Sequence, residues 1–286
     1  LSLAGVEWGL KPIEANEKIT NRPLLKTLKR ATIAVPLLVL GLSTYIYLEG
    51  HPLVSSHGKV AIGTKHFSEH IILGEMMAQI IESKTDLKVD RRFDFPGTMF
   101  CHKAILSGDI DIYPEYTGTA YSAILGYEPH SKQSPDEIFN KVQADYNKQF
   151  DLKWLSPFGF NNTYAMVVRK KDKEEYGWEK ISDLTDVAPS LVFGVASEFA
   201  ERPDGLKGLE NAYGLKFENV SDMDLNLVYN ALKNGEVDLI SANSTDGRIP
   251  AFDLAALEDD KRFFPPYEAA PLIREDTLAE HPELKE

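Results

Sequence analysis

The chain has 286 residues, of which 43% are hydrophobic and 26% charged, and its formal net charge is −13. This length accommodates one membrane segment together with one or two globular domains. A surface this acidic repels phosphate backbones, which excludes nucleic acid as an expected partner. The single cysteine, Cys101, excludes an internal disulfide and a zinc site built from cysteines, and no metal site is expected.

Residues 31–48 carry no charged side chain and are mostly apolar. At about 1.5 Å rise per residue, a helix of this length just spans a hydrocarbon core of roughly 30 Å. Basic residues precede the stretch at 26–30, and Tyr45 and Tyr47 lie near its end, as the positive-inside rule and the interfacial aromatic belt predict. We therefore expect a transmembrane anchor helix, with residues 1–30 cytoplasmic.

Two alternatives to the anchor remain open. A cleaved signal peptide has the same polarity, but residues 49–56 contain no small-x-small cleavage site. A buried core helix is the other alternative, although it does not need the flanking charge asymmetry. We expect residues 49–57 to be a linker and the chain to be a piece of a longer polypeptide, since it does not start with methionine.

The stretch up to residue 112 alternates short apolar strands with helical patterns. Residues 58–63 and 89–93 are expected strands, and the helix between them is expected to be capped by Ser68, whose hydroxyl can accept a backbone N–H of the first turn. A second helix ends at Gly108 and leads into a third strand. This order predicts an α/β lobe.

A second unit begins near residues 162–168, an apolar strand that runs into an expected charged turn at 169–173. Residues 191–194 are the next expected strand, and residues 225–234 are an expected helix. The chain then crosses back at about residue 245. Two crossings between two lobes predict a two-strand hinge, as in binding proteins that close around a ligand.

Two segments from different lobes follow the same residue pattern, AILSGDIDI at 104–112 and ALKNGEVDL at 231–239. Each reads as the end of a helix, a Gly suited to the left-handed conformation, and a short buried strand. Polar, hydroxyl-rich residues follow both strands, and ligands of α/β sheets bind beyond the carboxyl ends of strands. The echo therefore favours one ligand held between two similar lobes, although helix–Gly–strand is common enough to recur by chance.

The candidate cleft residues follow these strands or lie at the crossings. The expected set comprises Tyr116, Thr117, Thr119, Asn243, Thr245, Asp246, Tyr164 and Tyr267. Tyrosine faces around one point make a cage for a cation without donors, each worth about 0.5–2 kcal/mol once desolvated. Arg202 and Lys65 would bind a carboxylate at the other end of the ligand. Packing tyrosines and a structural Arg202–Asp204 ion pair are the alternative readings.

An enzyme is not expected. The chain has no G-x-S-x-G elbow, no His pair at metal-ligand spacing and no phosphate-binding loop, and no cofactor is predicted. Glu69 and Glu115 would serve as a general acid and base, but helix capping or a polar rim explains them more simply.

Residues 62–282 resemble the substrate-binding proteins of ABC importers for glycine betaine, choline, carnitine and related solutes. The motifs that carry the resemblance are GTKHFSE (63–69), YPEYTGT (113–119), GFNNTYA (159–165), EFAERPDG (198–205), ALKNGEVD (231–238), STDGRI (244–249) and LEDDKRFFPPY (257–267). The resemblance implies an α/β, two-lobed periplasmic-binding-protein fold, type II-like, over residues 58–286. We place the first lobe at about 58–162 and 245–286 and the second at about 163–244.

The resemblance also implies roles for individual residues. The tyrosines that match three walls of the family's aromatic cage are Tyr116, Tyr164 and Tyr267. The residues that match its carboxylate-binding group are Lys65, Thr119 and Arg202. The fourth wall is usually a Tyr just before the STD motif, and here that position is Asn243. Losing one ring weakens a trimethylammonium cage by ~1 kcal/mol, whereas a carboxamide offers one acceptor and two donors to a ligand with a polar ring.

Two ligand classes therefore stay open, the simple betaines and ergothioneine, a trimethyl betaine with a thiolated imidazole ring. Residues 1–48 resemble a permease tail followed by an extra anchor helix, as in family members fused to their permease. The expected partners are that permease, a separate ATPase subunit (the chain has no Walker motif), and the cell membrane, with the binding domain extracytoplasmic. A ligand-sensing ectodomain is a further alternative. Family members usually continue past the HPEL-like segment with more helices.

Overall fold

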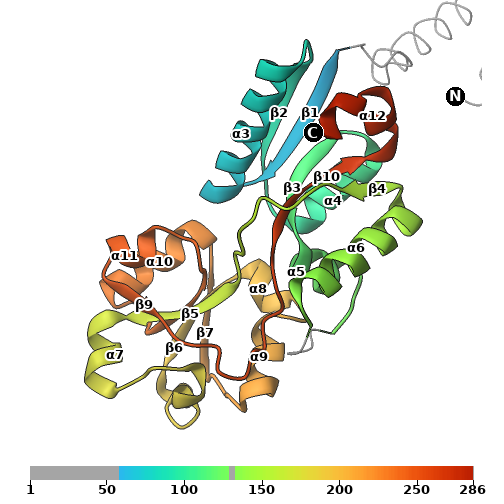
Figure 1. The fold of residues 1–286 in the computed structure, drawn as a ribbon. Helices are drawn as coiled ribbons and strands as arrows, with labels where there is room; N and C mark the ends of the chain where they lie inside the picture. Colours follow the sequence, from blue (N-terminus) through green and yellow to red (C-terminus); the bar gives the residue numbers. More distant parts are fainter. Residues whose placement is uncertain (1–57, 129–132, 286) are drawn as a thin grey trace, which may run out of the picture. The chain divides into compact units, whose positions relative to one another are not determined.

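The computed structural model describes residues 58–128 and 133–285 (Figure 1). The predicted anchor at 31–48, the residues before it and the linker at 49–57 lie outside these ranges. No helix within 58–128 or 133–285 has the length and apolar character needed to cross a membrane. Residues 58–286 form one compact unit, which contains two lobes.

The first lobe is built on a five-stranded sheet in the order β2-β1-β3-β10-β4. Its strands are β1 (Lys59–Lys65), β2 (Lys88–Phe95), β3 (Ile112–Tyr116), β4 (Leu152–Trp154) and β10 (Ala269–Arg274). Its helices are α3 (Ser68–Lys84), α4 (Thr98–Ser107), the single turn α5 (Thr117–Thr119), a π-helical turn (Ala120–Ile124), α6 (Pro135–Phe150), α12 (Glu275–Glu280) and a terminal 3₁₀ turn (Pro282–Lys285). The first three strands are parallel, and β10 is antiparallel to both of its neighbours.

The second lobe repeats this plan in the order β7-β6-β8-β5-β9. Its strands are β5 (Tyr164–Arg169), β6 (Val192–Ala196), β7 (Asn219–Met223), β8 (Leu239–Asn243) and β9 (Leu254–Ala256). Its helices are α7 (Lys170–Tyr176), two 3₁₀ turns (Ile181–Leu184 and Ala188–Ser190), α8 (Ser197–Glu201), α9 (Leu206–Tyr213), α10 (Leu225–Asn234) and α11 (Arg248–Ala251). Again three parallel strands are followed by an antiparallel one, β5.

The sequence echo corresponds to the same elements in both lobes, so the prediction of two similar lobes is confirmed. Helices α4 and α10 end at Gly108 and Gly235, each with φ +78°, the left-handed region in which a side chain is strained. Strands β3 and β8 follow at the centre of their sheets and are almost completely buried. The carboxyl end of β3 therefore places residues 116–119 in the region between the lobes, and the carboxyl end of β8 places residues 241–243 there.

Three local predictions are wrong. Ser68 is the first residue of α3 and not its cap; the N-cap position is Phe67, which provides no side-chain hydrogen bond. Residues 170–176 form helix α7 rather than a charged turn, with the side chain of Asp172 buried against Arg169 (Nε to Oδ2 2.5 Å). Because one face of this helix is held by an ion pair, its sequence lacks the apolar period that would have predicted a helix.

The third wrong prediction is the lobe boundary at residue 244. Strand β9 pairs with β5 in the second sheet, and Leu254 and Leu257 are buried in the second lobe's core. The return crossing therefore follows Leu257 and does not lie near residue 245.

The two crossing segments lie side by side and form the hinge (Figure 1). Asn161 of the first crossing pairs with Glu268 of the second, and Asn162 N–H donates to the carbonyl of Tyr267 at 3.1 Å. In return, the Tyr267 N–H donates to Asn161 Oδ1 at 2.6 Å. Asp259 anchors the second crossing to the second lobe, because its carboxylate accepts the N–H groups of Phe263 and Phe264 at 2.9 Å each.

Candidate functional site

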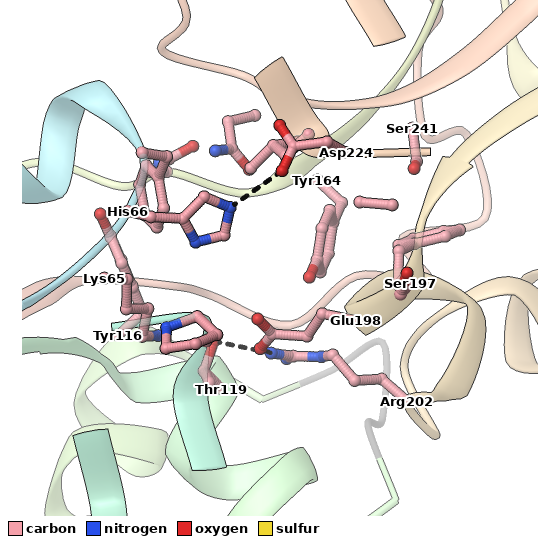
Figure 2. A pocket seen from close by; sticks show the side chains of 18 of the residues that line it. Lys65, His66, Tyr116, Thr119, Tyr164, Ser197, Glu198, Arg202, Asp224 and Ser241 are labelled. Carbon is pink, nitrogen blue, oxygen red and sulfur yellow. Dashed lines mark hydrogen bonds and ion pairs between the residues drawn. The ribbon is translucent and has the colours of Figure 1, made fainter. Parts of the chain in front are cut away.

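A pocket of about 180 Å³ lies between the lobes (Figure 2), with room for a small solute. Seven of the ten side chains predicted for the cleft line it, and they come from both lobes and the hinge: Lys65, Tyr116, Thr119, Tyr164, Arg202, Asn243 and Tyr267. The other three, Thr117, Thr245 and Asp246, do not line it: Thr117 donates to the carbonyl of Pro266, Thr245 donates to Glu69, and Asp246 pairs with Arg248. The residues that end β1, β3 and β8 are Lys65, Tyr116 and Asn243, and Thr119 lies in the turn after β3. Tyr164 starts β5, Tyr267 lies on the crossing before β10, and Arg202 follows helix α8. The structure thus brings together residues up to about two hundred positions apart in the sequence.

The three tyrosines hold different kinds of position. Tyr116 ends β3 and is 4% exposed, while Tyr267 lies on the second crossing and is 2% exposed. The rings of Tyr164 and Tyr267 meet edge to face, with centroids 5.8 Å apart and an interplanar angle of 82°. Gly118 makes this packing possible, because a Cβ there would lie 2.5 Å from the Tyr267 ring.

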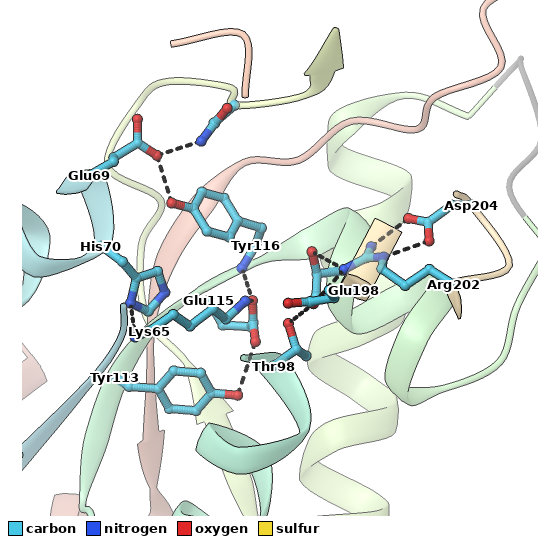
Figure 3. Close-up of polar contacts among 12 residues, drawn as sticks. Lys65, Glu69, His70, Thr98, Tyr113, Glu115, Tyr116, Glu198, Arg202 and Asp204 are labelled. Carbon is cyan, nitrogen blue, oxygen red and sulfur yellow. Dashed lines mark hydrogen bonds and ion pairs between the residues drawn. The ribbon is translucent and has the colours of Figure 1, made fainter. Parts of the chain in front are cut away.

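The hydroxyl of Tyr116 donates to Glu69 Oε1 at 2.6 Å (Figure 3). Burial and the charge of Glu69 raise the pKa of Tyr116 well above its ordinary value. Burial likewise raises the pKa of Tyr164 and Tyr267. All three rings are therefore neutral phenols at physiological pH, and neutral ring faces attract cations.

Lys65 is paired and buried. Its Nζ lies 2.8 Å from Glu115 Oε1, with the two side chains 5% and 0% exposed. The same carboxylate oxygen accepts the N–H of Tyr116 at 2.7 Å, and Glu115 Oε2 accepts from Tyr113. Because one buried charge neutralises the other, Lys65 does not by itself give the pocket a net positive charge.

Arg202 is held by a bidentate ion pair with Asp204, from Nε at 2.8 Å and Nη2 at 2.5 Å. Its remaining amino group, Nη1, reaches Thr119 Oγ1 at 3.2 Å and Glu198 Oε1 at 3.3 Å. The guanidinium carbon also lies 5.4 Å from the centroid of the Tyr164 ring. Arg202 therefore forms the structural ion pair with Asp204 and also lines the pocket, so both interpretations of this residue hold. Asp204 fixes the orientation of the Arg202 guanidinium.

Asn243 ends β8, and its backbone N–H donates to the hydroxyl of Tyr229 at 3.1 Å. Its side-chain amide lines the pocket and has no hydrogen-bond partner among residues 58–128 and 133–285. The carboxamide is therefore available to a ligand.

Several lining residues were not predicted from the sequence. They are His66, Phe67, Pro96, Gly97, Asn162, Ala196, Ser197, Glu198, Phe199, Met223, Asp224, Leu225 and Ser241. The motifs GTKHFSE, GFNNTYA and EFAERPDG contained signals for His66, Phe67, Asn162 and Glu198. Phe67 is the informative omission, since its ring stacks near Tyr116 (centroids 6.3 Å, 26°) and adds an aromatic face.

Side chains of the two lobes also contact each other directly across the pocket. Thr245 Oγ1 donates to Glu69 Oε2, and Thr98 Oγ1 donates to Glu198 Oε1, both at 2.5 Å. His66 Nε2 lies 3.7 Å from Asp224 Oδ2. These contacts describe a closed arrangement of the two lobes. Within the described ranges, no group of three or more His, Cys, Asp or Glu residues is arranged to hold a metal ion.

The chain matches one protein family, described as the substrate-binding domain of the ABC-type glycine betaine transport system, over residues 58–286. It is 37% identical over 233 residues to the carnitine transport binding protein OpuCC of Listeria monocytogenes, covering 81% of this chain and 75% of that protein. It is also 37% identical over 237 residues to EgtU of Helicobacter pylori (strain G27), an ergothioneine transport permease/ergothioneine binding protein. That match covers 82% of this chain and 41% of EgtU.

Among solved structures, the fold is similar to a glycine betaine/carnitine/choline ABC transporter protein. The TM-score is 0.64 at 34% sequence identity, and the match covers 79% of this chain and 84% of the other. The similarity agrees with the two-lobed α/β architecture described above.

Proposed function

Because the chain belongs to the substrate-binding domains of ABC-type glycine betaine transport systems, we propose that its pocket captures a quaternary ammonium betaine for an importer. Proteins of this family bind a substrate without transforming it, so the chain is not an enzyme. The ligand class is supported by the family, by the relatives that bind carnitine or ergothioneine, and by the aromatic pocket.

The single observation that carries the proposal is the convergence of three neutral tyrosine rings on one small pocket. A trimethylammonium group has no N–H to donate, so it is recognised by ring faces, each worth about 0.5–2 kcal/mol when water is excluded. Tyr116, Tyr164 and Tyr267 form this cage in the proposal. Phe67, which stacks near Tyr116, adds a further aromatic face to the same pocket.

The carboxylate of the ligand is assigned to Arg202, Lys65 and Thr119. Arg202 has its Nη1 group turned to Thr119, and a carboxylate at this point would accept from both side chains. Because Asp204 and Glu115 neutralise the two cations, we expect hydrogen-bond geometry rather than net charge to position the carboxylate.

Closure about the paired crossings at 161–163 and 267–268 buries the ligand and presents the closed lobes to a permease. In the proposal the domain is extracytoplasmic and held at the cell membrane by residues 31–48. The permease is part of the same polypeptide, as in EgtU, and the ATPase is a separate subunit.

The test is calorimetric titration of the chain with glycine betaine, choline, carnitine and ergothioneine. Tyr116→Ala should abolish binding of whichever ligands the unaltered chain binds, while Tyr116→Phe, which keeps the ring, should retain it. Unchanged affinity in a folded Tyr116→Ala variant would refute the cage. Failure of the unaltered chain to bind any of the four would refute the ligand class.

A second candidate ligand, ergothioneine, is favoured by one specific observation. Asn243 replaces an aromatic wall with an unpaired carboxamide in the pocket, and a carboxamide can hydrogen-bond to a polar ring. Asn243→Tyr should weaken ergothioneine binding and strengthen that of glycine betaine by about fivefold, the value of one ring face.

A further inference from the structure

Several polar atoms of the pocket have no partner within residues 58–128 and 133–285. Asn162 Oδ1 and Ser241 Oγ are buried and unpaired, in side chains that belong to residues 7% and 2% exposed. The orientation of the Asn162 amide is fixed, because its Nδ2 donates to Glu69 Oε1 at 2.7 Å. Its oxygen is therefore an unsatisfied acceptor in the pocket.

Glu198 supplies another acceptor. Its Oε1 accepts from Thr98 across the lobes and from Arg202 (Figure 3), but its Oε2 receives no hydrogen bond from the described residues. Oε2 is held close to the backbone of Gly97, where a Cβ would lie 3.0 Å away. The carboxylate is thus fixed by one oxygen and leaves the other available at the pocket wall.

The charge of Glu198 is maintained in this environment. Burial acts to raise its pKa, but the positive charges of Lys65 and Arg202 and the hydrogen bond from Thr98 outweigh burial, and the pKa is lowered. An ionised carboxylate is only an acceptor. Arg202 cannot fully satisfy it, because two of its nitrogens are committed to Asp204.

A buried acceptor left without a donor, as Asn162 Oδ1 is, costs about 1–3 kcal/mol. The side chain of Glu198 is 37% exposed, so it can be solvated until a ligand fills the pocket, and an unpaired charge then carries the larger cost. A trimethylammonium group and a carboxylate bring no donor, so a ligand with only these two groups leaves Glu198 and Asn162 unpaired. A ligand with an N–H or O–H group between or beside them removes this cost.

Resting on the proposed function, we propose that Glu198 is a specificity residue that selects quaternary ammonium ligands carrying an additional N–H or O–H donor. The donor is accepted by Glu198 Oε2, with Asn162 Oδ1 as the second acceptor. The class includes ligands with a ring N–H, such as ergothioneine, and ligands with a hydroxyl, such as carnitine and choline, and it disfavours glycine betaine.

The experiment compares ligands that differ in the donor. Carnitine is paired with γ-butyrobetaine, which lacks only the hydroxyl, and ergothioneine is compared with glycine betaine. Each is titrated calorimetrically into the unaltered chain and into Glu198→Gln, which keeps an oxygen for Thr98 and replaces the other oxygen with a donor. Glu201→Gln on the same helix is the matched control, because Glu201 is exposed and does not line this pocket.

We expect Glu198→Gln to weaken at least one donor-bearing ligand by about 10- to 100-fold, the value of a hydrogen bond to a charged group. Binding of γ-butyrobetaine or glycine betaine should change by less than about threefold, and Glu201→Gln should bind all ligands as the unaltered chain does. Weakened binding of ergothioneine identifies the donor as a ring N–H, and weakened binding of carnitine identifies it as a hydroxyl.

Equal weakening of donor-bearing and donor-free ligands would overturn the proposal, since it would mean that Glu198 acts as a counter-charge to the ammonium group. Unchanged affinities in a folded variant would also overturn it. Either result leaves the tyrosine cage intact, whereas the absence of all binding by the unaltered chain refutes the cage and this inference together.

Discussion

Thr245 of the second lobe donates a hydrogen bond to Glu69 of the first lobe, from Oγ1 to Oε2 at 2.5 Å. The other oxygen of Glu69 accepts from Tyr116 and Asn162. One carboxylate therefore connects the closed position of the second lobe to a ring and to an amide that line the pocket. Closure and the arrangement of the pocket are coupled through Glu69.

Thr245→Val should weaken ligand binding by about 2- to 10-fold, because it removes a hydrogen bond made only when the lobes are closed, worth about 0.5–1.5 kcal/mol at an exposed residue. The loss should be in the dissociation rate, measured by stopped-flow fluorescence. Thr245→Ser keeps the hydroxyl and should behave as the unaltered chain. A dissociation rate that is equal in Val and Ser variants would contradict the role of this contact.

Gly205→Ala should destabilise the domain by at least about 3 kcal/mol. A Cβ at Gly205 would lie 1.8 Å from the carbonyl oxygen of Phe199 and 3.1 Å from that of Arg202. Both are backbone atoms, so the clash is relieved only if the main chain itself shifts. The measurement is urea unfolding followed by circular dichroism. Gly247→Ala is the control, because no atom lies within 4 Å of its Cβ position and its φ is −62°; its free energy of unfolding should change by less than about 0.5 kcal/mol.

The free energy of unfolding should fall as pH drops below about 6.5. Burial and the charge of Lys65 lower the pKa of His70, and burial lowers that of His102, both from 6.5. The unfolded chain takes up a proton at each histidine near pH 6.5 and the folded chain does not, so stability is complete above this pH and lost below it. The slope is about 1.4 kcal/mol per pH unit for each histidine until its folded pKa is reached.

Urea unfolding at pH 7.5, 6 and 5 measures this slope. His102→Phe removes one of the two groups and should reduce the slope by about half, since a phenyl ring can occupy the place of an imidazole that meets Phe150 edge to face. A free energy of unfolding that is constant from pH 7.5 to 5 would show that neither histidine is kept neutral by the fold.

Cys101 should resist alkylation in the folded protein. The residue is 0% exposed, and burial raises the pKa of its thiol to about 12, so little thiolate forms at pH 8. Iodoacetamide labelling followed by mass spectrometry should therefore be slow and should accelerate at the urea midpoint. Lys103→Cys on the exposed face of the same helix should add one rapidly labelled thiol. Rapid labelling of Cys101 without denaturant would contradict its burial.

The repeated helix–Gly–strand pattern was sufficient to predict the plan of both lobes. Gly108 and Gly235 have the same left-handed conformation, and the strands after them occupy the same place in each sheet. Local sequence carries this information because the helix end, the turn and the buried strand are each determined by neighbouring residues. Six of the predicted residues line one pocket for the same reason, since they lie at or just after a strand end or at a crossing. Arg202 follows helix α8 instead, and the predicted cleft residues Thr117, Thr245 and Asp246 do not line the pocket.

The parts that the sequence did not predict depend on distant partners. Strand β9 has only three residues and no periodicity, and its pairing with β5 places it in the second lobe. The free oxygen of Glu198 is defined by Thr98, a hundred positions away in the other lobe. Similarly, the neutralisation of Lys65 by Glu115 follows from the meeting of β1 and β3, which no local pattern indicates.

The place of β10 in the first sheet has a consequence for how the protein is made. This strand, Ala269–Arg274, lies between β3 and β4, although it is synthesised after the whole second lobe. The first lobe therefore cannot complete its sheet on the ribosome while the second lobe is still being translated. Until β10 is synthesised, the strand edges of β3 and β4 that pair with it have no hydrogen-bonded neighbour. The second lobe, whose strands β5 to β9 are contiguous, is the one that can fold first, which reverses the usual N-terminal-first order of nascent domains.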